Sequence, residues 1–415
     1  MMLCYVNRKD VLKCTYSICF RKVFEYVYYV NCIRRISHFI HKYSLIFIII
    51  VLNIISFRSK ASMHDLYGEY VDIDEIENEL GNIDNGDDSP VKISFHDIYD
   101  LLLSGNVEEA LAKCFESIGN SLTIEMIQNR NLLLRLLVLI IIAAVFNNYS
   151  SVLKISFVGE QGFFITYLMA CSILLKSFFL IYDMSESAIN YISEAMECML
   201  PAFTMSLVMC SGIATSQMTN SIFLFLLSVM EKVLLYGILP MIRIYFLIIL
   251  LNQLNGRDRF SKLAELIKQI AEWILKGFVT AVIGLNAVKS MLIPVYENAR
   301  YNMIQKGIAM IPGGSSVTNL SGIMLGAGVL IKNCVGITAV IVLFVIGSIP
   351  MLKLLYFYIS YRLVLAAAQP VSDQRILQGI QGACDATSVL IKTVLTALSL
   401  CVLSIAIIIL ATNRY

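Results

Sequence analysis

The sequence predicts an all-α polytopic membrane protein: a helical bundle with broken or re-entrant helices, preceded by a signal segment and a small helical extracytoplasmic region. Two observations carry this fold class. Hydrophobic residues make up 58% of the 415 residues and charged residues only 15%, which is outside the range of a soluble domain. Several apolar stretches also approach or exceed the roughly 20 residues that a helix needs to cross a bilayer.

Charge divides the chain into three predicted regions. Residues 1–61 are basic and contain the signal peptide or anchor, residues 62–131 form an acidic helical region outside the cytoplasm, and residues 132–415 form a multi-span transmembrane domain. Residues 61–131 hold 16 Asp and Glu against three Lys and Arg. This segregation does not suggest a nucleic-acid partner, and the eleven cysteines show no paired spacing that predicts a disulfide framework.

The signal segment is predicted from the apolar run Leu45 to Ile55. Its eleven residues are too few to cross a hydrocarbon core of about 30 Å, but they suit the apolar part of a signal peptide. Ser59-Lys60-Ala61 resembles a cleavage site. The preceding basic region is long for a signal peptide, so an uncleaved anchor and an amphipathic cytoplasmic arm stay as alternatives.

The acidic region is expected to form short exported helices. Ser94 and Asn106 each offer a side-chain oxygen to an early backbone amide, with a carboxylate three residues later near the positive helix end. The acidic surface is either a solvated face or a docking surface for the exported domain of a partner.

Five stretches of the remaining chain are predicted spans: Leu132–Tyr149, Phe163–Tyr182, Ile274–Tyr296, Val335–Ile359 and Val389–Ala411. Lys154 follows the first span, and the acidic connection Asp183–Glu197 follows the second. The positive-inside tendency therefore places Lys154 inside and this connection outside. A helical stripe of apolar residues predicts that the connection lies along the membrane interface; its members are Ile189, Ile192, Ala195, Met196 and Met199.

The number of spans depends on Met199 to Leu251. Met199–Ala214 is marginally long, and Ser211-Gly212 together with Thr215–Ser221 predicts a break. Ser221–Leu251 would be about 46 Å long as a helix. Because Glu231-Lys232, Gly237, Pro240 and Arg243 interrupt it, we expect a kinked element or two short ones.

Arg257–Glu272 is predicted to be a cytoplasmic amphipathic helix at the interface. Its bases outnumber its acids, and its apolar residues keep the helical period. Trp273, the only tryptophan, follows directly, at the junction with the next predicted span. This position is typical of the aromatic belts of membrane proteins.

Pro294–Ile337 is the stretch that reads least like lipid-facing helix. Pro312 lacks a backbone donor and the following glycines tolerate positive φ, so a helix break is expected there. Irregular backbone at membrane depth persists only where protein or water covers it. We predict a re-entrant or broken-helix element that lines a partly hydrated path, with an ordinary loop as the alternative. The candidate path or packing residues are Arg300, Pro312, Gly313, Gly314, Gly322, Gly326, Lys332 and Asn333.

The sequence offers no catalytic constellation. It has no phosphate-binding loop, no HExxH, no GxSxG and no dinucleotide fingerprint, and its four histidines all precede residue 132. We expect no enzyme activity, cofactor or metal. Lys176, Lys289, Lys353 and Lys392 are interpreted as snorkelling or packing residues.

Several motifs of the chain resemble the stage III sporulation protein AE family. They are Ala299-Arg300, Ile311-Pro312 with Gly314, the run from Ile331 to Ile337, and Ala366 to Pro370. Asn319 and Gly322 stand where acidic family residues are expected. The resemblance covers roughly residues 94–411.

The resemblance implies a membrane component of a channel or secretion-like complex, located in the mother-cell membrane around the forespore. Such a protein is needed for forespore development after engulfment, and its partners include ring-forming proteins and an ATPase. A stand-alone secondary transporter or permease is the alternative function, and a structural scaffold is a third.

Overall fold

The structure is a computed structural model. It describes the backbone of residues 156–211, 213–254, 260–309, 314–369 and 374–412, and of single residues 101, 109, 112, 134 and 138. Side chains are described for these single residues, for residues 164–208, 216–253, 260–285, 332–369 and 374–406, and for residue 409. The predicted signal segment, nearly all of the acidic region and the predicted span Leu132–Tyr149 lie outside the described residues, apart from the single residues.

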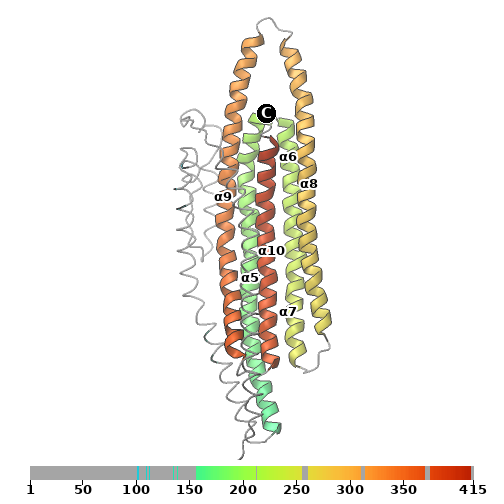
Figure 1. Cartoon of the computed structure of the whole chain (residues 1–415), viewed down its shortest axis with the longest axis vertical. Coiled ribbons are helices and arrows are strands. Elements are labelled where there is room, and N and C mark those ends of the chain that lie inside the picture. Colours follow the sequence, from blue (N-terminus) through green and yellow to red (C-terminus); the bar gives the residue numbers. More distant parts are fainter. Residues whose placement is uncertain are drawn as a thin grey trace, which may run out of the picture. The chain divides into compact units, whose positions relative to one another are not determined.

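The elements of the described part are all helical, apart from short connections. They are α5 (Ser156–Ser211), α6 (Ile213–Lys232), the π-helix η1 (Val233–Ile238), α7 (Leu239–Leu254), α8 (Ser261–Ala309), α9 (Gly314–Ala368) and α10 (Gln374–Thr412). Because α6, η1 and α7 follow one another without a gap, they make one long helical rod. Figure 1 shows α5, this rod, α8, α9 and α10 side by side, each reversing the direction of the one before. α10 packs against α9, α5, α8 and α7, so it is the central helix.

Among the described residues, four helical stretches are long and apolar enough to cross a membrane: Phe164–Val208, Ser216–Gln253, Lys332–Ala368 and Gln374–Ala406. This confirms the prediction of an all-α, multi-pass membrane protein. The shortest stretch has 33 residues, or about 50 Å of helix. Every stretch is therefore longer than the hydrocarbon core, which is about 30 Å thick.

The prediction that Asp183–Glu197 connects two separate elements is wrong, because α5 continues through these residues and through Pro201. The predicted apolar stripe is nevertheless real. Ile189, Ile192 and Ala195 are fully buried, and Met196 and Met199 nearly so. The stripe faces the neighbouring helices of the bundle rather than a membrane surface, and the acidic side chains lie on the opposite face of α5.

The break predicted at Ser211-Gly212 is confirmed by the end of α5 at Ser211 and the start of α6 at Ile213. Across this reversal the Ser216 hydroxyl donates a hydrogen bond of 2.7 Å to the Thr204 carbonyl. The second part of that prediction, a break over Thr215–Ser221, is wrong because those residues belong to α6.

The interruption expected in Ser221–Leu251 takes the form of a π-helix rather than a gap. The Leu239 amide bonds to the Leu234 carbonyl, five residues earlier. Pro240 follows directly and has no amide hydrogen to give to an α-helical ladder. One wider turn lets the rod continue past this proline, as π-bulges do within other helices.

The expected break near Pro312 is bounded by the end of α8 at Ala309 and the start of α9 at Gly314. Pro312 and Gly313 lie outside the described residues. A re-entrant element therefore stays a prediction.

Close helix contacts fix the register of α9 against α10. A Cβ atom on Gly336 would collide with Ile409, and one on Gly347 would come within 2.7 Å of Leu398. The two contacts are equally spaced along the two antiparallel helices. Lys353 lies six residues after Gly347 on α9, and Lys392 lies six residues before Leu398 on α10. These two lysines are therefore nearly level in the bundle.

The predicted span Phe163–Tyr182 and the predicted cytoplasmic segment Arg257–Glu272 lie at one level of the bundle. Phe178 of α5 stacks on Phe246 of α7 with ring centroids 4.1 Å apart, and the Lys268 ammonium of α8 is 5.9 Å from the ring of Tyr245. One level of a packed bundle is not both in hydrocarbon and in the cytoplasm, so these two predictions are not compatible in this fold.

Candidate functional site

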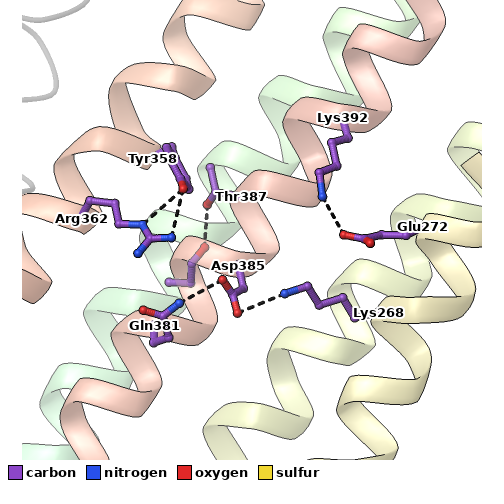
Figure 2. A network of polar contacts seen from close by, with 9 residues as sticks. Lys268, Glu272, Tyr358, Arg362, Gln381, Asp385, Thr387 and Lys392 are labelled. Atoms are coloured by element: carbon purple, nitrogen blue, oxygen red, sulfur yellow. Dashed lines mark hydrogen bonds and ion pairs between the residues drawn. The ribbon is translucent and has the colours of Figure 1, made fainter. Parts of the chain in front are cut away.

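Two ion pairs join α8 to α10 and form the main polar network between helices in the described part of the chain. Lys268 Nζ lies 3.1 Å from Asp385 Oδ2, and Lys392 Nζ lies 2.7 Å from Glu272 Oε1 (Figure 2). We call these four residues the α8–α10 charge ladder. Their side chains are 24–34% exposed, so each pair is mostly removed from solvent.

The helix period explains why the ladder forms. Lys268 and Glu272 are four residues apart and share one face of α8, while Asp385 and Lys392 are seven apart and share one face of α10. Each face therefore presents one cation and one anion. The two helices run in the same direction in Figure 1, so Lys268 meets Asp385 and Glu272 meets Lys392.

Neighbouring groups complete the ladder. Gln381 Nε2 donates a hydrogen bond of 3.0 Å to Asp385 Oδ1, and Tyr245 of α7 lies against Lys268. Burial raises the pKa of the Glu272 carboxyl, but the hydrogen bond and charge of Lys392, with the charges of Lys268 and Lys276, outweigh burial and hold this pKa below its ordinary value of 4.5. Glu272 lies outside the four candidate spans.

This network is not among the predictions from the sequence, in which Lys392 is interpreted as a snorkelling or packing residue; in the structure Lys392 is ion-paired. Lys268 and Glu272 are predicted to lie on an amphipathic helix at the interface. In the structure Lys268 and Glu272 face α10, whereas Lys262 and Glu265 are exposed and pair with each other. The apolar Leu263, Leu266 and Ile270 are exposed as well. The signal that could have found the ladder is the presence of opposite charges at helical spacing on both segments.

Lys332 and Asn333, two of the predicted path residues, lie at the start of the described side chains of α9. Lys332 is 0% exposed and Asn333 is 5% exposed. Asn333 Oδ1 accepts no hydrogen bond from the residues that the structure describes. Both polar groups are thus inside the bundle, in a helix that carries no other charge from Gly314 to Leu352. The hydrated path through these two residues stays a prediction.

For four other predicted path residues the structure describes the backbone only. Arg300 lies on α8, and Gly314, Gly322 and Gly326 lie on α9, but the surroundings of these four are outside the described side chains. Their roles stay predictions.

Among the residues that the structure describes, no group of three or more His, Cys, Asp or Glu could hold a metal ion. A small cavity between α6, α8 and α10 is lined almost wholly by apolar side chains, among them Leu226, Val282 and Leu400, with the Ser404 hydroxyl as a polar exception. This lining offers few groups for a polar ligand.

Comparison with known proteins gives one family. The model of the family "Stage III sporulation protein AE" matches residues 93–412. The Stage III sporulation protein AE of Bacillus subtilis (strain 168) is 22% identical over 255 residues, which are 61% of this chain and 64% of that protein. The chain thus spans a little less than two thirds of this relative. No solved structure matches.

Proposed function

Because the chain belongs to the stage III sporulation protein AE family, we propose that it is a membrane component of a channel or secretion-like complex between mother cell and forespore. The match of the family model over residues 93–412 is the observation that carries this proposal. Family membership implies a role in sporulation, and the four long apolar helices make the chain a multi-pass membrane protein.

The proposed location is the mother-cell membrane around the forespore, and the proposed partners are ring-forming proteins and an ATPase. Both partners are proposed from membership of the family alone. We also propose that the chain is not an enzyme, since its sequence has no catalytic constellation.

The proposed route through the protein passes Lys332 and Asn333. A buried ammonium in an otherwise charge-free helical stretch is expensive unless it faces protein or water, and such residues usually mark a pathway or a polar contact between helices. The buried, unsatisfied Asn333 oxygen supports water in this place. A stand-alone transporter would use the same residues, so the choice between the two functions needs an experiment.

Deletion of the gene in a spore-forming host tests the proposal. Cells should grow normally, complete engulfment and then stop forespore development, and the intact gene in trans should restore spores. A vegetative growth defect would contradict a role confined to sporulation. The complex should also be recovered when the chain is purified after cross-linking of sporulating cells, whereas solute uptake by the pure chain in vesicles would favour the transporter.

A further inference from the structure

The four candidate spans have 33 to 45 residues, but about 20 helical residues cross the hydrocarbon core. Hydropathy therefore leaves open which half of the bundle the bilayer surrounds. The outer surface formed by η1, α7 and α8 bears on this choice.

The exposed side chains of α8 change character at Trp273. Before it, Lys262, Glu265 and Gln269 are exposed among the apolar residues. After it, the exposed large side chains are Ile274, Ile283 and Leu285, and Lys276 is the one exposed charge up to Leu285. Helical side chains lean toward the helix N-terminus, so the long Lys276 side chain reaches back toward the level of Trp273.

A second exposed aromatic residue lies close to the same level. Tyr236 of η1 is 79% exposed and Trp273 is 68% exposed. The contact between Lys268 and Tyr245 aligns α8 with α7. Trp273 lies five residues beyond Lys268 on α8, and Tyr236 lies nine residues from Tyr245 in the same direction along the bundle. At 1.5 Å per residue, Trp273 and Tyr236 therefore differ in height by about 6 Å. Beyond Tyr236 and the exposed Lys232, α6 exposes the apolar side chains of Phe225, Leu224 and Met218.

We infer that the headgroup boundary of the bilayer crosses this side of the bundle at Trp273 and Tyr236. The hydrocarbon core then surrounds the half that contains α6 and the C-terminal half of α10. Trp and Tyr favour the membrane–water boundary because one end of the ring system is apolar and the other donates hydrogen bonds. The α8–α10 charge ladder lies at this boundary and on its aqueous side.

The distribution of charge also supports a bilayer around the half that contains α6 and the C-terminal half of α10. No charged residue occurs in Ile213–Met230, Asn333–Leu352 or Thr393–Thr412. The contacts of Gly336 with Ile409 and of Gly347 with Leu398 place the last two stretches at one level. The other half exposes charges on three helices: Lys176, Lys262, Glu265 and Arg375. An aqueous position of Ser261–Glu272 is therefore favoured over a crossing at Phe163–Tyr182.

The acidic face of α5 is the least favourable surface for this placement of the bilayer. Glu194 and Glu197 are exposed on the hydrocarbon side of the boundary, and a carboxylate that faces acyl chains is costly. The surface of η1, α7 and α8, by contrast, has no exposed carboxylate beyond Trp273 among its described side chains.

The native fluorescence of Trp273 tests the inference without a mutation, because the chain has one tryptophan. The full chain is reconstituted in phosphatidylcholine vesicles whose lipids carry bromine either near the carbonyl end or near the end of the acyl chains. Quenching should be strongest with the shallow bromines, and iodide in the buffer should quench weakly. Strong iodide quenching without bromolipid quenching, quenching by neither, or strongest quenching by the deep bromines would each overturn the inference.

Two variants with the tryptophan at another position test the predicted depth in the bilayer on either side of Trp273. In a Trp273→Phe background, Phe225→Trp should be quenched most by deep bromines, whereas Phe260→Trp should be quenched by iodide and not by bromolipids. Both phenylalanines are exposed, at 66% and 49%, so neither change disturbs the core. A reversed order would place the bilayer around the other half of the bundle. The result is independent of the proposed complex, which the deletion experiment tests.

Discussion

Lys392 of α10 and Glu272 of α8 lie 120 residues apart in the sequence, yet Lys392 Nζ is 2.7 Å from Glu272 Oε1. The contact joins the central helix to the helix that sequence reasoning placed at the membrane surface. Together with the Lys268–Asp385 pair, it makes the first turns of α8 part of the bundle.

Removal of this ion pair should destabilise the bundle. Lys392→Met leaves Glu272 half-buried without its main partner, so the free energy of unfolding should fall by about 1.5–3 kcal/mol, the range for a hydrogen bond to a charged group. A double-mutant cycle with Glu272→Gln, read from unfolding in detergent, should show coupling between the two residues. Lys262→Met is the matched control, because the Lys262–Glu265 pair is exposed at 91% and 56% and should contribute little.

The Lys392–Glu272 pair also predicts how the stability of the bundle depends on pH. The pKa of Glu272 is lower in the folded chain than its ordinary value. The stabilisation is therefore complete above about pH 4.5 and is lost as the pH falls through the lower, folded pKa. The acid-induced loss of stability should be smaller in the Glu272→Gln variant; an unchanged acid profile would contradict this assignment.

Close packing of α9 on α10 should make Gly347 intolerant of a side chain. Three atoms of Leu398 lie within 3.2 Å of the position that a Cβ would take. Gly347→Leu should lower the free energy of unfolding by about 1–3 kcal/mol, as overpacking of a core does. Gly284→Leu is the control, because nothing lies within 4 Å of its Cβ position. Equal thermal stability of the two variants would show that α9 and α10 are not packed this closely.

The stacked rings of Phe178 and Phe246 should be a major contact between α5 and α7. Both side chains are 0% exposed. Phe246→Ala should cost about 3–5 kcal/mol of stability, as large-to-small core substitutions do, and should lower accumulation of the protein in membranes. Phe225→Ala removes an exposed ring of the same size and should change the midpoint of thermal unfolding little.

The proposed path makes Lys332 and Asn333 testable in function. Lys332→Met should leave insertion intact and lower spore formation, since the ammonium is replaced by an apolar chain of similar length. In a variant without native cysteines, Asn333→Cys should react with a water-soluble thiol reagent, whereas Val340→Cys, at an apolar buried position on the same helix, should not. Full activity of the first variant together with an unreactive cysteine at position 333 would rule out the hydrated path.

The acidic region gives a prediction on topology. Alkaline phosphatase fused after Gly119 should be active, because residues 62–131 follow an apolar segment and hold far more acids than bases. A cytoplasmic reporter at the same place should be inactive. The opposite pattern would reverse the predicted orientation of this region.

The class of the protein and several local features follow from the sequence without its tertiary structure. Composition and apolar stretches predict a helical membrane protein because both are properties of residues close together in the chain. The same holds for the stripe from Ile189 to Met199, whose helical period survives although the expected connection does not. The helix end at Ser211 and the π-helix beside Pro240 likewise follow from local backbone chemistry.

Tertiary structure alone decided which helix faces meet. A lysine in an apolar stretch looks the same in sequence whether it snorkels, as proposed for Lys392, or pairs with a carboxylate on a distant helix. The continuation of α5 through Asp183–Glu197 also has a tertiary cause, because the buried stripe on one face stabilises the helix while the acids occupy the other. Helical period is local, whereas burial and ion pairing depend on residues that folding brings from far along the chain.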